Sequence, residues 1–126
     1  MKIACIIAAS FLSSVALAAE PGLVVAGRGV SLEEALAQPH APNYRLLVLR
    51  EELLRLRGSP AGEDVRLLLK SARRDGAVVF VCERDLRAER LERSDLVPGV
   101  VAVAASSDWV NGTPSQADRV LRTLCS

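Results

Sequence analysis

The segment Ala77–Cys82 constrains the fold more than any other part of the chain. Its sequence, Ala-Val-Val-Phe-Val-Cys, is apolar and rich in β-branched residues, and it follows Asp75-Gly76, a pair typical of the end of a helix. A short apolar run with such a boundary is typical of a strand buried on both faces of a parallel sheet. The carboxyl ends of these strands are where open α/β sheets place ligands and catalytic groups. The segment therefore predicts an α/β fold and makes Cys82 the first candidate functional residue.

Short apolar runs and helical patterns alternate along the rest of the chain. Further strands are expected at residues 23–26, 44–49 and 100–104. A short helix is expected to begin at a capping box of Ser31 and Glu34 and to end at Pro39, and a helical turn is expected at 51–57. An amphipathic helix should run through Val65 and Ala72, followed after the next strand by a charged helix at 84–93. The final helix is expected to have Thr113 as its N-cap and Pro114 at its first position. This order predicts a small parallel sheet of four or five strands with helices on both faces.

The N-terminal residues have the form of a secretion signal. Met1-Lys2 supplies a positive charge, residues 3–17 are apolar with small serines, and Ala16-Leu17-Ala18 has the small-x-small form of a cleavage site. We therefore expect a signal peptide at 1–18, a single domain at 19–126 that begins at Ala19 or Glu20, and a periplasmic location. The alternative is that residues 2–9 form the first strand of a cytosolic domain.

Composition removes several classes of partner. The 16 basic and 15 acidic residues nearly cancel and alternate along the chain, so no phosphate-tracking surface is expected and nucleic acid is not a predicted partner. No membrane association is expected once the signal is cleaved. The single histidine, His40, lies between two prolines in a predicted exposed loop and is not expected to act as a base. With one histidine and two distant cysteines, no metal-ligand spacing is available, and no metal or cofactor is predicted.

Cleavage of the signal leaves two cysteines, Cys82 and Cys125. A pair in an exported protein raises the possibility of a disulfide, which depends on how close the two residues lie in the fold. If Cys82 is free, Arg84 and Arg87 are the candidate cations that would stabilise its thiolate. Cys125 lies on the apolar stripe of the final helix, so we expect it to be the inert cysteine and Cys82 the reactive one.

These residues resemble a known family. Gly76–Cys82, then Leu86, then Leu96-Val97-Pro98-Gly99-Val100 are similar to the DsrE/DsrF-like sulfur-relay proteins, over about residues 44–124. The resemblance implies a flavodoxin-like α/β domain that assembles into homo- or hetero-oligomers. It also implies that Cys82 accepts sulfur as a persulfide and passes it on.

Three functions follow, and the sequence leaves them open. The first is a persulfide carrier that acts through Cys82 and meets a sulfur donor or acceptor protein. The second is a non-catalytic oligomeric binding module in which Cys82 is structural. The third is a rhodanese-like sulfurtransferase, since Cys82–Arg87 has the length of a six-residue loop that begins with Cys and ends with Arg. A carrier or binding protein is favoured over a turnover enzyme, because no acid or base accompanies Cys82. Homo-oligomers are expected, with Val97, Trp109 and Val110 as candidate contact residues.

Overall fold

The computed structural model describes residues 22–58, 62–104 and 115–126 of the chain. Several predictions fall outside these residues: the signal peptide at 1–18, the start of the domain at Ala19 or Glu20, and the contact residues Trp109 and Val110. Thr113 and Pro114 also lie outside them, although the helix that they were expected to start is described.

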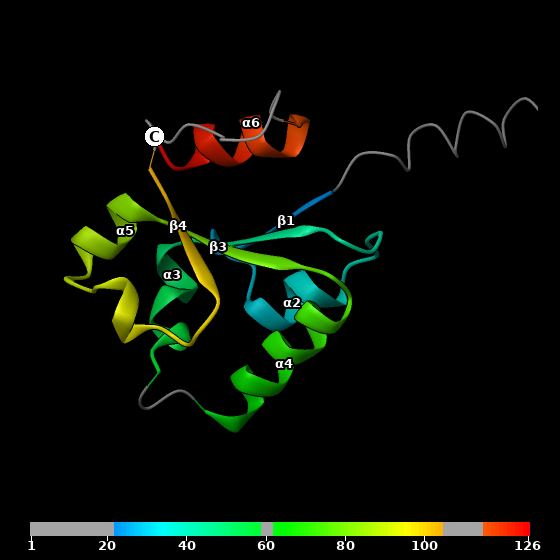
Figure 1. Ribbon diagram of the computed structural model, residues 1–126, viewed down its shortest axis with the longest axis horizontal. Coiled ribbons are helices and arrows are strands. Elements are labelled where there is room, and N and C mark those ends of the chain that lie inside the picture. The colour runs from blue at the N-terminus through cyan, green and yellow to red at the C-terminus, as the bar shows by residue number, and fades with distance from the viewer. Residues whose placement is uncertain (1–21, 59–61, 105–114) are drawn as a thin grey trace, which may run out of the picture.

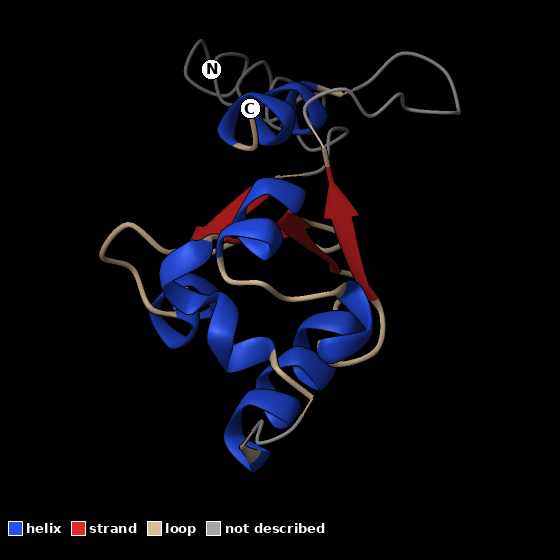
Figure 2. Ribbon diagram, turned by 90° about the vertical axis from the view of Figure 1, so that its left-hand side faces the viewer, coloured by secondary structure: helices blue, strands red, loops and turns tan. Residues whose placement is uncertain are grey.

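Four parallel strands form one sheet in the order β1-β2-β3-β4. The elements are β1 Leu23–Ala26, α2 Leu32–Ala37, β2 Arg45–Val48, α3 Arg50–Leu53, the 3-10 turn η1 Leu54–Leu56, α4 Glu63–Arg74, β3 Val78–Cys82, α5 Glu83–Ala88, the 3-10 turn η2 Arg93–Asp95, β4 Val100–Val103 and α6 Gln116–Leu124. Because consecutive strands are neighbours and crossovers share one hand, the helices between them lie on one face. Of the described helices, α6, which follows the last strand, is the one that lies on the other face (Figure 1, Figure 2). This arrangement confirms the predicted small α/β fold, consistent with a flavodoxin-like class.

The sheet separates two apolar cores. Along β3, Val79 and Val81 point to the side of α2–α5, whereas Phe80 and Cys82 point to the side of α6. Successive side chains of a strand alternate between faces, so a strand buried on both faces must be apolar throughout. The larger first core collects residues from α2, α3, α4 and α5. The smaller second core, which α6 covers, consists of Leu47, Leu49, Phe80, Cys82, Val103, Leu121 and Cys125.

The turn that starts β3 depends on Gly76. Its backbone has a φ of +86°, and the amides of Gly76 and Ala77 bond back to the carbonyls of Arg73 and Ala72, which closes the end of α4. A Cβ atom added to Gly76 would lie 2.0 Å from Oδ1 of Asn43. The helix end predicted at this glycine is therefore confirmed, and it fixes where β3 enters the sheet.

Two helix predictions are corrected. The charged segment 84–93 is helical only to Ala88, because Arg90 takes a left-handed conformation (φ 54°) and the amide of Leu91 bonds back to the carbonyl of Leu86. The final helix begins at Gln116 with Ser115 as its N-cap, two residues later than the Thr113 cap predicted from the sequence.

Val97 was a candidate subunit contact, and the structure contradicts this. The side chain is buried in the first core, and its amide donates to the carbonyl of Leu56 at 2.8 Å.

None of the helices in the described part of the chain is long and apolar enough to cross a bilayer.

Candidate functional site

Cys82 is the last residue of β3, an inner strand of the sheet. It lies opposite Val103 of β4 and is also the N-cap residue of α5, so the chain turns from strand to helix at this cysteine. Its side chain points to the α6 face and is completely buried, with an exposed fraction of 0%. The predicted position at the carboxyl end of a buried strand is therefore confirmed.

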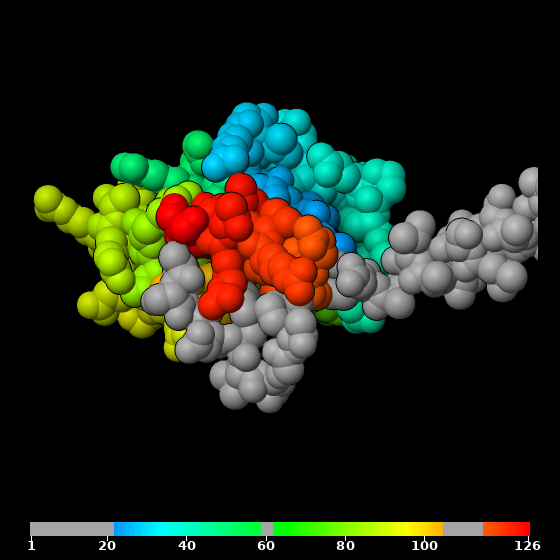
Figure 3. Space-filling view, turned by 90° about the horizontal axis from the view of Figure 1, so that it is seen from above, coloured from blue at the N-terminus to red at the C-terminus, as the bar shows by residue number. Residues whose placement is uncertain are grey.

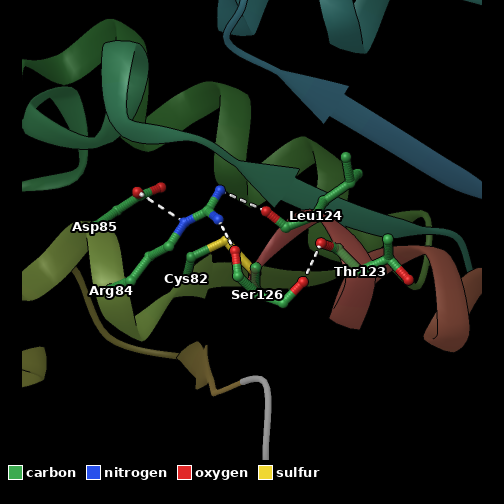
Figure 4. Close-up of a disulfide and its surroundings, with 7 residues drawn as sticks. Cys82, Arg84, Asp85, Thr123, Leu124 and Ser126 are labelled. Carbon is green, nitrogen blue, oxygen red and sulfur yellow. Dashed lines mark hydrogen bonds and ion pairs between the residues drawn. A yellow bond between two sulfur atoms is a disulfide. The ribbon is translucent and has the colours of Figure 1, made fainter.

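Cys82 forms a disulfide with Cys125, the residue that ends α6 (Figure 4). The two Cα atoms are 5.1 Å apart although the cysteines are separated by 43 positions in the sequence, and Cys125 is 97% buried (3% exposed). The bridge that the sequence left open is thus present in the structure. In this state neither cysteine carries a thiol, so neither of them is a nucleophile.

Arg84 is directed at the end of α6 rather than at a thiolate. Its guanidinium donates to the carbonyl of Leu124 at 2.5 Å and to the carbonyl of Ser126, and its Nε atom lies 3.6 Å from Oδ1 of Asp85 (Figure 4). The last carbonyls of a helix have no partner within the helix and carry partial negative charge, so a cation placed there stabilises the helix end. Arg84 therefore holds the same end of α6 that the disulfide holds.

Arg87 forms an ion pair with Glu83 at 2.7 Å, one turn earlier on α5. Both side chains are exposed to solvent, and the i,i+4 spacing places them on the same side of the helix. Of the three predicted site residues, the structure brings Cys82 and Arg84 together at the end of α6, whereas Arg87 is occupied by the carboxylate of its own helix.

The other end of α6 is held by an ion pair that the sequence analysis missed. Asp118 lies 2.6 Å from Nε of Arg45 on β2, an ionic contact that is poorly aligned for a hydrogen bond, and a longer contact of 3.5 Å joins its Oδ2 to Nη2. The same carboxylate accepts from the amide of Ser115 at 3.1 Å, while the Ser115 hydroxyl accepts from the amide of Asp118. The Ser-x-x-Asp spacing at the start of the helix was a usable signal for this reciprocal cap.

These contacts fasten α6 to the sheet at both ends. Figure 3 views this face with α6 across it in orange and red, and its red C-terminal end lies beside the yellow-green α5. The disulfide and Arg84 act at the C-terminal end, and the ion pair between Arg45 and Asp118 acts near the N-terminal end. Between them, Leu121 packs into the second core.

The region around Cys82 offers little other chemistry. Ligands bind at the carboxyl ends of open sheets where the strand order reverses, and the order of the described strands follows the chain without a reversal. Within residues 22–58, 62–104 and 115–126, no group of three His, Cys, Asp or Glu side chains is placed to hold a metal ion.

His40 is not the exposed loop residue expected from the sequence. It is half-buried, and its ring packs against Tyr44 with the centroids 3.9 Å apart. Burial, assisted by the charge of Asp75, raises the pKa of Tyr44 above its ordinary value. The contact with the ring of Tyr44 therefore accounts for the partial burial of His40.

No family model matches the chain, and no curated protein matches it. The function must therefore be argued from the disulfide and its surroundings.

Proposed function

We propose that the protein is an exported α/β module that acts by non-covalent binding, and that Cys82 is a structural half-cystine within it. The observation that carries this proposal is the buried disulfide between Cys82 and Cys125. A sulfur carrier needs a thiolate that a donor can reach, whereas both sulfur atoms here are bonded to each other in an apolar core. The proposed export agrees with a structural disulfide, because disulfides persist in oxidising compartments.

The setting of the disulfide supports a structural role. The second core is small, and among the described elements it is α6 that covers it, so the helix has little apolar area with which to hold itself to the sheet. A covalent link at one end, together with Arg84 and the pair of Arg45 and Asp118, supplies the attachment that packing alone does not.

The test is the redox state of the protein purified from the periplasm without reductant. We expect the mass of the intact protein to be about 2 Da below that of the fully reduced chain, since bridging removes two hydrogens. We also expect no alkylation of Cys82 or Cys125 in denaturant and no persulfide on either after polysulfide treatment. The matched control is Cys125→Ser, which frees Cys82. A native protein that carries a persulfide on Cys82 would contradict the proposal.

A second candidate is the persulfide carrier suggested by the resemblance, acting in the reduced form. The observation that favours it is the position of Cys82 at the N-cap of α5, where the partial positive charge of a helix start stabilises an anion. A dithiol reductant would first transfer two electrons to the disulfide and leave two thiols. The Cys82 thiolate would then attack the outer sulfur of a donor persulfide, forming a new S–S bond while the donor leaves as a thiolate.

The two candidates differ in what reduction produces. For a carrier, mild reduction followed by a low-molecular-weight persulfide should load one sulfur atom on Cys82 while α6 stays folded. For a structural disulfide, the same reduction should destabilise α6 and load nothing specifically. Mass spectrometry of the intact protein and its far-ultraviolet circular dichroism, recorded on the same sample, separate these outcomes. No observation favours the rhodanese-like alternative, since residues 83–88 form α5 rather than an open anion-binding loop.

Self-association remains part of the proposal. Val78 on β3 and Val101 on β4 both point to the α6 face, and their exposed fractions are 44% and 39%. Apolar side chains on neighbouring strands that stay exposed in one chain are candidates for a subunit contact. Sedimentation of the mature protein at tens of micromolar tests this. A purely monomeric profile at that concentration would refute it.

A further inference from the structure

A cavity of about 360 Å³ lies on the side of the sheet opposite to the disulfide. One wall is α4, and the other walls are the chain after η1 and the turn before β4. The lining residues are Gly58, Arg66, Leu69, Arg73, Val97 and Pro98. Leu69 and Val97 belong to the first core, so this cavity is separated from the cysteines by the sheet.

The walls of the cavity are tied to each other. The amide of Gly58 donates to the carbonyl of Asp95 at 2.8 Å, and the amide of Val97 donates to the carbonyl of Leu56 at 2.8 Å. These two bonds flank a short antiparallel bridge between Arg57 and Leu96. The two loops that line the cavity therefore form one connected wall.

Two arginines face this cavity from the same helix. Arg66 and Arg73 are seven positions apart on α4, about two helical turns, so they project from the same side. Arg66 Nη2 donates to the carbonyl of Gly58 at 3.2 Å, and Arg73 Nη2 donates to the carbonyl of Pro98. Each guanidinium is thus held by a neutral backbone group that does not cancel its charge.

The glycine after Pro98 makes room for the second arginine. Gly99 has a φ of +86°, and a Cβ atom added to it would lie 2.9 Å from Nη2 of Arg73. The guanidinium therefore lies directly against the backbone of this turn. This gives the Pro-Gly step, already prominent in the sequence, a second role besides entry into β4.

The charges in the cavity are not compensated. Among the described residues, neither Arg66 nor Arg73 forms an ion pair with a carboxylate, and no acidic side chain belongs to the cavity lining. A guanidinium has five N–H donors, and a single carbonyl uses only a part of them. The remaining donors on both arginines are available to an anion.

The rest of the lining is apolar. Leu69 and Val97 are buried apolar side chains that line the cavity, and Pro98 lines it as well. We propose that this cavity binds a small organic anion, in which a carboxylate is paired by Arg66 and Arg73 and an apolar body lies against Leu69 and Val97. The combination of apolar walls and a few placed polar groups is typical of small-molecule sites. Planar guanidinium groups are well matched to a carboxylate.

Titration of the full-length chain, expressed through its natural export route, with octanoate tests this proposal. We expect saturable shifts of the Gly58, Val97 and Gly99 amide resonances in heteronuclear NMR. Arg66→Gln and Arg73→Gln should each weaken binding about tenfold or more, as expected for loss of a charge-assisted hydrogen bond. The matched control is Arg74→Gln, because Arg74 is an exposed neighbour on α4 that does not line the cavity; it should bind octanoate as the native protein does.

Two further ligands decide which part of the proposal holds. Octylammonium carries the same apolar chain with the opposite charge and should not bind at this site. Inorganic phosphate carries negative charge without an apolar body and should bind much more weakly than octanoate. The proposal is overturned if octanoate produces no saturable shifts, if both arginine variants bind it as the native protein does, or if either of the other two ligands binds as tightly.

Discussion

Reduction of the Cys82–Cys125 disulfide should lower the stability of the protein by an amount that follows from its sequence separation. Cross-linking two residues removes conformational freedom from the unfolded chain, and the effect grows with the logarithm of the loop length. The separation is 43 positions. For a loop of this size the chain-entropy relation gives about 4 kcal/mol at room temperature.

Urea unfolding of the oxidised and reduced protein measures this difference without changing any side chain. A slope of about 2 kcal/mol per molar urea is typical of a small domain, so the midpoint should fall by about 2 M on reduction. The control is the double variant Cys82→Ala, Cys125→Ala, whose midpoint should not respond to the reductant.

Equal midpoints for the oxidised and reduced native protein would refute this reasoning. That result would mean that the cross-link does not restrict the unfolded chain as its loop length requires, or that the cysteines are not bridged in solution. A loss confined to the exchange protection of α6, with the sheet unchanged, would show that α6 unfolds separately from the rest of the domain.

Three smaller perturbations test other contacts. Arg84→Gln should lower the free energy of unfolding by about 1 kcal/mol and speed amide exchange at the C-terminal end of α6, because two carbonyls lose a cationic donor. The control Arg87→Gln removes only an exposed ion pair and should lower the free energy of unfolding by less than about 0.5 kcal/mol. Asp118→Asn should lower the free energy of unfolding in urea by about 2 kcal/mol, because it weakens the helix cap and leaves the partly buried guanidinium of Arg45 on β2 without its anion. A loss of stability no larger than that of the Arg87→Gln control would contradict this. A hydrogen bond from Arg55 lowers the pKa of Glu33 from 4.5 to about 2. The stability that this carboxylate contributes is therefore complete above pH 4.5 and is lost as the pH falls toward 2. An NMR titration of Glu33 should find a midpoint near 2, and this midpoint should rise in Arg55→Gln.

The fold was predictable from the sequence because a strand that is buried on both faces is apolar along its length. Residues 78–82 must satisfy a helix layer on one side and α6 on the other, so no polar residue interrupts them. The start of α6 was less predictable. Thr113-Pro114 and Ser115-x-x-Asp118 are overlapping cap patterns two residues apart. The second one forms, and its carboxylate also pairs with Arg45, 73 positions earlier in the chain. A contact of that range has no local signature.

In the candidate site, too, the local features were predictable and the long-range contacts were not. The position of Cys82 at the end of a buried strand follows from its neighbours, but its partner follows from where the final helix docks. Arg84 is two residues from Cys82 in the sequence, and proximity suggested that it would face the sulfur. Its side chain reaches instead to the carbonyls of Leu124 and Ser126, because the end of α6 presents unpaired acceptors at that point. The sequence neighbours of a cysteine therefore did not identify its electrostatic environment.

The disulfide also makes residues 82–125 a closed covalent ring that contains the edge strand β4. A single backbone cut anywhere between the two cysteines leaves both fragments attached, so cleaved protein would migrate as two pieces only after reduction. An edge strand carries unpaired backbone groups that can join the sheet of another molecule. Here β4 cannot be exchanged between molecules together with α6 while the ring is closed, because the end of α6 is bonded to β3 of its own chain. Oxidation thereby restricts domain swapping at this edge of the sheet.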